Sequence, residues 1–440
     1  MISNLLATKL HRPNPPARPV RRAQLVRKLN EGLVAGRRLT LVSAPAGFGK
    51  TTCVSEWLNG AELPVAWLSL DAADDDPGRF LAYVVSALQG VDSSIGRELE
   101  GALQAGQSSA ILALTTALIN DILRAGARIC LVLDDFQAIH AKPILDAVEA
   151  LITGGPQNLH LVLITREDPP LPLGRLRAHD KMTELRAGDL RFSEEEAGDL
   201  LNERMALSLS PAEVAALEKR TEGWVAGLQL AGLSMRGHAD PTGFIARLSG
   251  SHRHILGYLT EEVLDRQPPD IREFLLQTSI LGRLNGELCD AVTARPDCKR
   301  LLEQAWLANL FLIPLDENGE WYRYHHLFGE LLQTRLRQSW AAADVEALHR
   351  RASAWLAVHG QADEAIRHAL AGRDFEQAVA LVDGMARGMI FAGRMQTLRS
   401  WIVAFPAEFR AAHPRLEAYR IWIELLEGKL DFGEKAAQAR

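Results

Sequence analysis

The sequence lacks the features that mark a membrane protein or a disulfide-rich secreted protein. Its 440 residues contain no apolar run as long as a membrane span requires. Cys53, Cys130, Cys289 and Cys298 form no CxxC pair, and no secretory signal precedes them. This spacing argues against a zinc or disulfide framework and predicts a location in the reducing cytoplasm, away from membranes.

Acidic residues outnumber basic ones outside the N-terminus. Residues 1–40 hold nine Lys/Arg and one acidic residue, which gives this segment a net charge of +8. Because the whole chain has a net charge of −6, the remaining residues carry −14. An acidic body binds nucleic acid poorly through long-range electrostatics. Pro13, Pro15, Pro16 and Pro19 exclude the amphipathic helix of a transit peptide, so we expect an extended strap here.

Five short apolar runs predict the strands of an α/β domain. Their hydrophobicity is continuous rather than alternating, which is typical of parallel strands buried on both faces of a sheet. The runs are residues 39–43, 65–70, 129–133, 159–165 and 181–185. One long helical stretch is predicted between the second and third runs, with Asp76 as its N-cap before Pro77.

The segment SAPAGFGKTT, residues 43–52, has the spacing of a phosphate-binding loop except that Ala44 stands at the first glycine position. Alanine suffices there if the backbone φ is one that an L-residue can reach. A buried strand precedes the loop and a helix is predicted over residues 51–58, so backbone N–H groups and a helix N-terminus would face the phosphates. The predicted nucleotide contacts are Pro45, Ala46, Gly47, Phe48, Gly49, Lys50, Thr51 and Thr52.

Within this loop, Lys50 is predicted to bind the β- and γ-phosphates and the Thr51 hydroxyl to bind Mg²⁺. We expect the lysine to face the surface, so that its removal would not disturb the core. The alternative is a chance strand–turn–helix with an ordinary surface lysine.

Two further polar groups follow predicted strands. Asp134 and Asp135 come directly after residues 129–133, where the first could hold Mg²⁺ through water and the second could position or deprotonate the attacking water. The alternative is a turn with two exposed acids. Arg166 follows the next strand and could sense the γ-phosphate, or it could pair with Glu167 or Asp168 at the surface.

The rest of the chain is predicted to be mainly helical. Capping boxes at residues 193–196 and 210–213 open two helices, and a third follows Gly223. A hairpin with its turn at residues 316–319, preceded by helices, indicates a winged helix. After residue 341 the pattern resembles an α-solenoid whose last pair is incomplete, so we expect a chain that is cut short. The predicted domains are residues 1–38 (strap), 39–190 (nucleotide-binding), 191–250 (helical), 251–338 (winged helix) and 339–440 (helical arm).

Seven ordered motifs resemble the N-terminal portion of the MalT-type, large ATP-dependent LuxR-family regulators. They are LATKLHRPNPPARPVRRAQL, SAPAGFGKTT, LVLDDFQAI, ITREDPPLPLGRLR, LRFSEEEA, TEGWVAGLQLA and YRYHHLFGELL. The resemblance implies a STAND-class P-loop ATPase that uses ATP or ADP with Mg²⁺ and hydrolyses ATP slowly. It implies an ADP-bound resting monomer that opens, with ATP and a small-molecule or protein inducer, to a self-associating form. DNA contact would require a C-terminal helix-turn-helix that is absent from this chain.

The resemblance also implies roles for single residues. Val20 and Arg22 would lie in the strap that contacts the nucleotide base, and Arg166 would be the sensor arginine. His325 would be directed at the β-phosphate of ADP, whereas the residues alone favour a packing or capping histidine.

Two other functions stay open on sequence grounds. One is a metabolic P-loop NTPase such as a kinase, although no lid-like arginine cluster is evident. The other is a DNA-binding protein that uses the winged helix with a nucleotide-sensing domain, although the basic residues of 299–337 are offset by acidic ones.

Overall fold

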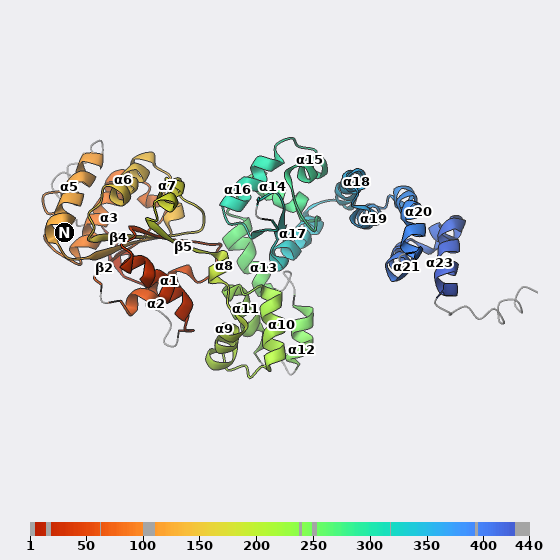
Figure 1. Cartoon of the computed structure of the whole chain (residues 1–440), viewed down its shortest axis with the longest axis horizontal. Helices are drawn as coiled ribbons and strands as arrows, with labels where there is room; N and C mark the ends of the chain where they lie inside the picture. Colours follow the sequence, from red (N-terminus) through yellow and green to blue (C-terminus); the bar gives the residue numbers. More distant parts are fainter. Residues whose placement is uncertain are drawn as a thin grey trace, which may run out of the picture. The chain divides into compact units, whose positions relative to one another are not determined.

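The fold divides into two compact units. The computed structural model describes residues 5–14, 19–61, 63–99, 111–236, 240–248, 253–316, 318–391 and 395–426. One unit contains residues 1–266, 305–311 and 325–327, and the other contains residues 267–304, 312–324 and 328–440. Figure 1 shows the elements of each unit, which are described separately below.

A five-stranded, fully parallel sheet forms the centre of the first unit. The strand order is β2-β3-β4-β1-β5, so β4 lies between β1 and β3. This order brings the carboxyl ends of β1, β4 and β3 to the same edge of the sheet. The strands are β1 (Leu39–Ser43), β2 (Val65–Ser69), β3 (Ile129–Asp134), β4 (Leu159–Thr165) and β5 (Met182–Arg186).

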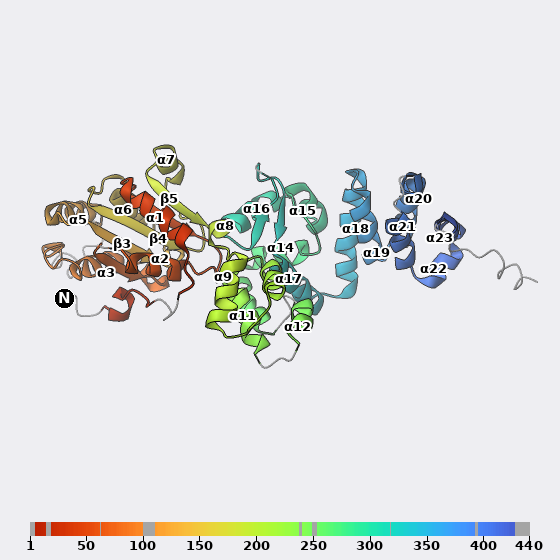
Figure 2. The ribbon, with the colours of Figure 1, turned by 60° about the horizontal axis from the view of Figure 1, so that its bottom comes forward.

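Helices cover both faces of this sheet (Figures 1 and 2). Leu39 and Leu41 of β1 belong to the large core shared with the helices of one face, whereas Thr40 hydrogen bonds His160 on the other face. Trp57 lies edge-on to His160, and its indole donates to Asn30, which joins the two helices of that second face. The first face carries α3 (Pro77–Gln89), α5 (Ile111–Ala125), α6 (Lys142–Thr153) and α7 (Leu173–Ala178), and the second carries α1 (Ala23–Val34) and α2 (Lys50–Asn59).

The predicted doubly wound α/β fold is confirmed, although β2, β3 and β5 each differ from the predicted bounds by one residue. The fifth strand spans Met182–Arg186, and the carbonyl of Lys181 just before it accepts hydrogen bonds from the amides of Arg38 and Leu39 at the start of β1. In the described part of this segment, the single helical stretch expected before the third strand is divided into α3 and α5, with turns at residues 90–91 and 93–98. The N-cap prediction for α3 is confirmed, since Asp76 accepts the amide of Arg79 at 2.8 Å.

The N-terminal segment is tied to the sheet domain by an ion-pair cluster. It contains a short 3₁₀ turn, η1 (Ala7–Leu10), before the segment that leads to α1. Lys9 binds Asp71 at 2.6 Å and also the fully buried Asp74, which accepts from Arg79 as well. Asp71 and Asp74 lie in η2 and its cap, where η2 spans Ala72–Asp74. The prolines expected to keep residues 15 and 16 extended lie outside the described residues.

A helical segment follows the sheet within the first unit. The predicted capping boxes are confirmed: Ser193 and Ser210 each accept the amide three residues later, from Glu196 and Glu213. Two helices continue as π-helical turns, η5 (Asp199–Arg204) and η6 (Thr260–Leu264). The helices are α8 (Ala187–Leu190), α9 (Glu194–Gly198), α10 (Pro211–Thr221), α11 (Val225–Met235), α12 (Pro241–Arg247) and α13 (Arg253–Leu259).

The second unit holds a winged helix and a helical arm. The strands β6 (Leu312–Pro314) and β7 (Tyr322–Tyr324) pair antiparallel, and Asp316 accepts the amides of Glu320 and Trp321 to close their turn. The winged-helix helices are α14 (Pro269–Thr278), α15 (Gly286–Thr293), α16 (Cys298–Leu307) and α17 (His326–Ser339), of which residues 305–307 and 326–327 belong to the first unit. The arm contains α18 (Ala342–Val358), α19 (Ala362–Ala371), α20 (Phe375–Phe391), α21 (Met395–Ala404), α22 (Ala407–Ala412) and α23 (Pro414–Leu426).

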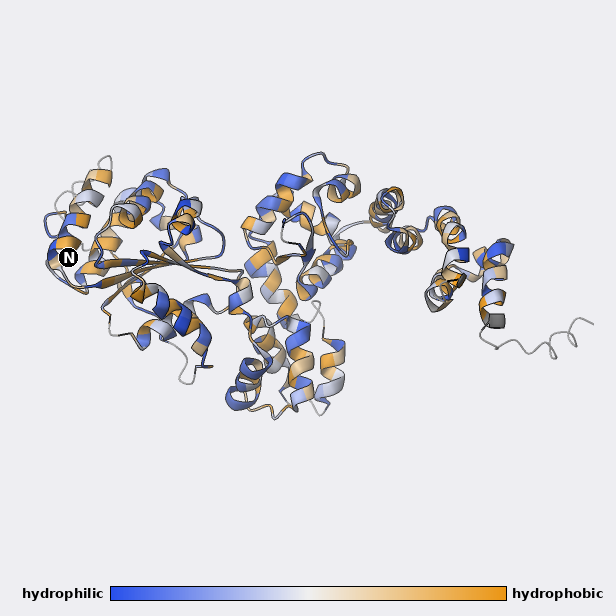
Figure 3. Ribbon diagram, viewed as in Figure 1, coloured by the Kyte–Doolittle hydropathy of each residue, from blue (hydrophilic) through white to orange (hydrophobic). Residues whose placement is uncertain are grey.

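The strands of the large sheet are mostly hydrophobic, whereas the helices mix hydrophobic and hydrophilic residues (Figure 3). Among the described residues, no helix is both long enough and apolar enough to span a bilayer. The predicted incompleteness of the last helical pair concerns residues 427–440, which lie outside the described residues. The domain boundaries proposed from the sequence remain predictions.

The close approach of α1 to β5 gives a test of the packing. A Cβ built at Gly32 of α1 would lie 2.0 Å from Oγ1 and 3.1 Å from Cβ of Thr183, a β-branched and buried residue of β5. We therefore expect Gly32→Ala to lower the free energy of unfolding by about 1–3 kcal/mol through overpacking. Gly174→Ala is the matched control, because a Cβ there meets no atom within 4 Å. Equal denaturation midpoints for both variants would contradict this packing.

Candidate nucleotide-binding site

The loop after β1 has the backbone of a phosphate-binding loop. Gly47 and Gly49 adopt left-handed φ values of 76° and 74°, whereas Ala44 is not among the residues with positive φ. The expectation that alanine fits the first position is therefore confirmed. At Gly47 a Cβ would lie 2.6 Å from the Ala226 Cβ and 2.8 Å from the Trp224 Nε1, so no side chain fits there.

Lys50 is the first residue of α2, and its side chain turns back over the loop. Its ammonium donates to the carbonyls of Ala44 and Pro45 at 2.7 and 2.9 Å. The residue is only 9% exposed, so the expectation of a surface-facing lysine is wrong. Burial lowers the pKa of Lys50 to about 8, and the positive charge of Arg166 lowers it further. The lysine is therefore held against the backbone of the loop by these two carbonyls.

Thr51 and Asp134 meet at the edge of the sheet. The Thr51 hydroxyl donates to Oδ1 of Asp134 at 3.1 Å, and that same oxygen accepts the amide of Asp135. Asp134 is 3% exposed, and burial raises its pKa to about 6, with the neighbouring charge of Asp135 acting in the same direction. A hydroxyl and a buried carboxylate oxygen are hard ligands that suit Mg²⁺.

Asp135 differs from its neighbour in exposure and conformation. It is exposed and has a left-handed φ of 56°. Its carboxylate accepts a hydrogen bond from the side-chain Nε2 of Gln137 at 2.8 Å. The side-chain Oε1 of Gln137 in turn accepts the backbone amide of Arg166 at 3.0 Å. Gln137 therefore connects the acid pair to the next strand end.

Arg166 directly follows β4 and lies near Lys50, and the predicted alternative of a surface pair with Glu167 or Asp168 is wrong. Its guanidinium donates to the carbonyl and the carboxylate of Glu262 at 3.2 and 3.3 Å, not to Glu167 or Asp168. Asn309 binds the Arg166 carbonyl at 2.9 Å and Oγ of Ser43 at 3.1 Å. Asn309, which follows the C-terminus of α16, thus connects the ends of β1 and β4.

The start of α11 holds the phosphate loop from the other side. The Trp224 indole donates to the carbonyl of Ala46 at 3.1 Å, and the amide of Ala226 donates to the carbonyl of Gly47 at 3.0 Å. Trp224 is fully buried and also contacts the ring of Tyr258. Phe48 of the loop packs against Phe311, with ring centroids 6.0 Å apart. The helical segment therefore shapes the loop directly.

His325 is buried against the same tryptophan. It is 2% exposed, lies edge-on to Trp224 and Phe311, and donates through Nε2 to the carbonyl of Thr221 at 2.8 Å. This donation leaves Nδ1 as an acceptor, and Nδ1 is buried with no partner in the described part of the chain. Burial lowers the pKa of His325 to about 4, so the ring is neutral at pH 7.

A cavity of about 350 Å³ opens beside the loop. Its wall combines three segments: the N-terminal segment, the loop with α2, and the helical segment. Apolar and aromatic side chains predominate, with a few polar groups, which is the usual composition of a small-molecule site. The lining residues are Pro19, Val20, Arg22, Gly47, Phe48, Gly49, Thr52, Cys53, Glu56, Phe192, Leu200, Arg204, Val225, Ala226, Gln229 and Tyr258.

Val20 and Arg22 both line this cavity, but the Arg22 guanidinium is already occupied. It donates to the carbonyls of Leu190 and Arg191 at 2.8 and 2.6 Å, and to both carboxylate oxygens of Glu196 at 3.2 and 3.1 Å. It also covers the ring of Phe192 at 4.7 Å. Val20 is buried. The strap therefore closes the cavity, with its arginine bound to the helical segment.

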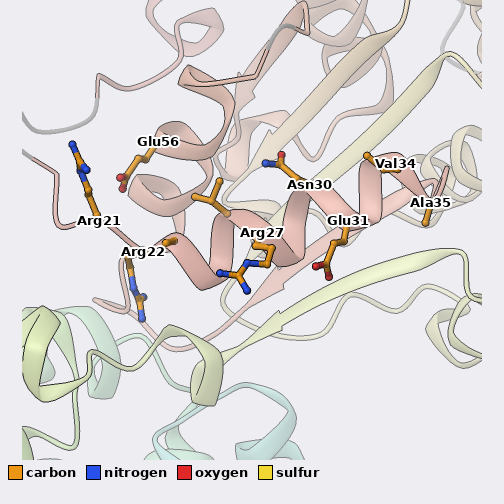
Figure 4. Close-up of a pocket in the computed structure, with 10 residues that line it drawn as sticks. Arg21, Arg22, Arg27, Asn30, Glu31, Val34, Ala35 and Glu56 are labelled. Carbon is orange, nitrogen blue, oxygen red and sulfur yellow. The ribbon is translucent and has the colours of Figure 1, made fainter.

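A larger, open hollow of about 730 Å³ runs along α1 (Figure 4). Arg21, Arg27 and Glu31 edge it, and no residue of the phosphate loop lines it. Glu56 contributes to both the hollow and the cavity. The phosphate-binding features therefore belong to the cavity alone.

Sequence reasoning missed the residues that close the site over the loop. Trp224 and Ala226 fall in the motif TEGWVAGLQLA, which supported the resemblance but received no role. Glu56, Arg204 and Asn309 have no motif around them. In the described residues, no cluster of three or more His, Cys, Asp or Glu side chains forms a metal site.

Comparison with known proteins places the chain among P-loop NTPases. Models of the AAA domain and of the MalT winged helix domain match residues 34–168 and 260–344. The Walker-type ATPase PABY2304 of Pyrococcus abyssi has a similar fold, with a TM-score of 0.50 and 16% identity, covering 74% of this chain and 100% of that chain. The class is a P-loop NTPase with a winged-helix domain.

Two curated relatives refine this class. The serine/threonine-protein kinase PknK of Mycobacterium tuberculosis is 34% identical over 423 residues, which are 96% of this chain and 38% of that protein. The HTH-type transcriptional regulator MalT of Yersinia enterocolitica is 32% identical over 421 residues, 95% of this chain and 46% of that protein. The chain is thus MalT-like over nearly its whole length, as its motifs predicted, and it spans less than half of these relatives.

The position of Lys50 gives the first test of the site. Lys50→Met keeps most of the side-chain volume and removes the charge that would bind phosphate, so we expect ADP and ATP affinity to fall at least about tenfold. Titration calorimetry measures the affinities, and thermal unfolding checks the fold. Lys142→Met is the control, because that side chain is 84% exposed and pairs with Asp146 on the same helix, α6. Unchanged affinity in folded Lys50→Met would contradict the assignment.

Proposed function

We propose that this chain is the nucleotide-dependent switch of a STAND-class, MalT-type regulator, in which ADP stabilises a closed resting form and ATP an open form. The observation that carries the proposal is the double contact of Trp224. Its indole holds the phosphate-loop carbonyl of Ala46, and its ring packs against His325 at the start of α17. A change in the loop therefore reaches the residue that follows the wing.

The residues of the cavity suit a nucleotide with Mg²⁺. Lys50 would exchange the carbonyls of Ala44 and Pro45 for phosphate oxygens, and the loop amides from Ala46 to Thr52 would surround them. Thr51 and Asp134 would hold Mg²⁺, which supplies positive charge against the phosphates when bound. The buried Lys50 and Asp134 carry pKa values shifted toward their neutral forms, and ligand charges of opposite sign would reverse both shifts.

Slow ATP hydrolysis would reset the switch. Asp135 is exposed to solvent beside Asp134, and Gln137 holds its carboxylate by one hydrogen bond. From this position it could orient or deprotonate a water molecule, while Arg166 could stabilise the γ-phosphate after leaving Glu262. This arrangement supports a slow ATPase rather than a metabolic enzyme.

The partners of the switch are proposed from the family relation. We expect a small-molecule or protein inducer to favour the ATP form, and we expect that form to self-associate. The Yersinia relative is named an HTH-type transcriptional regulator, and the present chain matches 46% of it. DNA reading would then depend on a helix-turn-helix that the sequence of residues 1–440 does not predict.

The proposed hydrolytic role of Asp135 can be tested directly. Asp135→Asn removes the basic carboxylate but keeps an oxygen that can accept from Gln137, so ATP should bind normally while hydrolysis falls on the order of a hundredfold. Phosphate release under single-turnover conditions measures the rate. Asp146→Asn, at the exposed ion pair of α6, should hydrolyse ATP like the original chain. An undiminished rate for Asp135→Asn would remove Asp135 from the mechanism.

The proposed role of His325 predicts a difference between nucleotides. If His325 supports only the closed form, His325→Ala should weaken ADP binding by about tenfold and ATP binding much less, because a ligand shifts an equilibrium by its differential affinity. His326→Ala is the neighbouring control, since the side chain of His326 is 61% exposed. Equal losses for ADP and ATP would restrict His325 to packing.

A further inference from the structure

The cavity contains two charged side chains that the described protein leaves without hydrogen bonds. Arg204 is the last residue of the π-helical turn η5, and its Nη2 is buried with no hydrogen-bond partner among the described residues. Glu56 lies on α2, is half-buried, and likewise forms no hydrogen bond in the described part of the chain. Leaving a buried guanidinium donor unpaired is costly, so a ligand atom that accepts from Arg204 would be favoured at this cavity wall.

Glu56 and Arg204 carry opposite charges and interact electrostatically across the cavity wall. Burial raises the pKa of Glu56 and lowers the pKa of Arg204, and in each case the charge of the other residue opposes the effect of burial. They do not form an ion pair within 4 Å, although both line the same 350 Å³ cavity. A flat ligand group with a donor beside an acceptor could therefore bind between them.

The distance along α2 identifies which part of a nucleotide this is. Glu56 follows Lys50 by six residues, and six residues of α-helix rise about 9 Å. Phosphates bind at the N-terminus of α2, so Glu56 stands at the depth of the nucleoside. Val20, Phe192 and Leu200 supply apolar walls of the same cavity, against which a flat base could pack.

Arg22, the side chain that the family resemblance placed at the base, is not available for this task. All of its nitrogen atoms donate to Glu196 or to carbonyls of residues 189–191. Figure 4 shows its guanidinium directed away from Glu56. With Arg22 occupied, the charged side chains that remain in the cavity wall are Glu56 and Arg204.

We propose that Glu56 and Arg204 read the adenine base. The Glu56 carboxylate accepts from the exocyclic amino group, and the Arg204 guanidinium donates to a neighbouring ring nitrogen. Adenine offers this pairing of a donor beside an acceptor, whereas hypoxanthine presents a carbonyl oxygen to the carboxylate. The inference rests on the proposed nucleotide site and adds its base specificity.

The experiment compares ADP, inosine diphosphate and 2′-deoxy-ADP by titration calorimetry. The original chain should prefer ADP over inosine diphosphate by about tenfold or more. Glu56→Ala and Arg204→Ala should each reduce this preference to within about threefold, with the ratio of ADP to 2′-deoxy-ADP unchanged. Glu56→Gln keeps the side-chain volume and adds a donor for the hypoxanthine carbonyl, so it should shift the preference toward inosine diphosphate.

Matched controls separate base reading from general effects. Glu31→Ala and Arg27→Ala remove exposed charges from the hollow along α1 and should leave the preference intact. The inference is overturned if the original chain shows no preference for ADP, if the variants keep it, or if they change only the deoxy-ADP ratio, which would assign the pair to the ribose. Failure of the nucleotide site itself would appear separately, as unchanged ADP affinity in Lys50→Met.

Discussion

The conformation of the phosphate loop depends on two buried hydrogen bonds from a different part of the fold. The Trp224 indole and the Ala226 amide hold the carbonyls of Ala46 and Gly47, which turns the opposite side of the loop toward the cavity. Gly47 permits this approach because any Cβ would collide with the same residues. Since Trp224 also contacts Tyr258 and His325, the loop cannot move far without disturbing all three. The site is therefore a joint property of the sheet and the helices that follow it.

Much of the sheet and the phosphate loop could be predicted because local chemistry determines them. Continuous apolar runs fixed β1 and β4 to the residue, and small residues before Lys50 fixed the loop between a strand and a helix. The burial of Lys50 could not be predicted, since it depends on carbonyls that point back at the ammonium. Glu262 as the partner of Arg166 was equally hidden, because 96 residues separate them in sequence. Long-range contacts of single side chains leave no periodic pattern.

The charged side chains of the site are buried, but their hydrogen bonds go to uncharged groups. Lys50 donates to carbonyls rather than to a carboxylate, and Asp134 receives a hydroxyl and an amide rather than a cation. Burial accordingly shifts the pKa of each toward its neutral form. Such a site gains more from an ionic ligand than a solvated surface would, because the penalty of burial has already been incurred in folding.

On the proposed function, the Arg166–Glu262 pair explains how one cavity could distinguish two nucleotides. Glu262 lies in η6, just after the helix that carries Tyr258, so the pair ties the end of β4 to the helical segment. ADP has no γ-phosphate and would leave this tie intact. The γ-phosphate of ATP would be a more highly charged acceptor for Arg166 than a half-exposed glutamate. If Arg166 bound this phosphate, it would release Glu262 and loosen the helical segment from the sheet. The nucleotide difference would thus act on the same segment that supplies Trp224 and contacts His325.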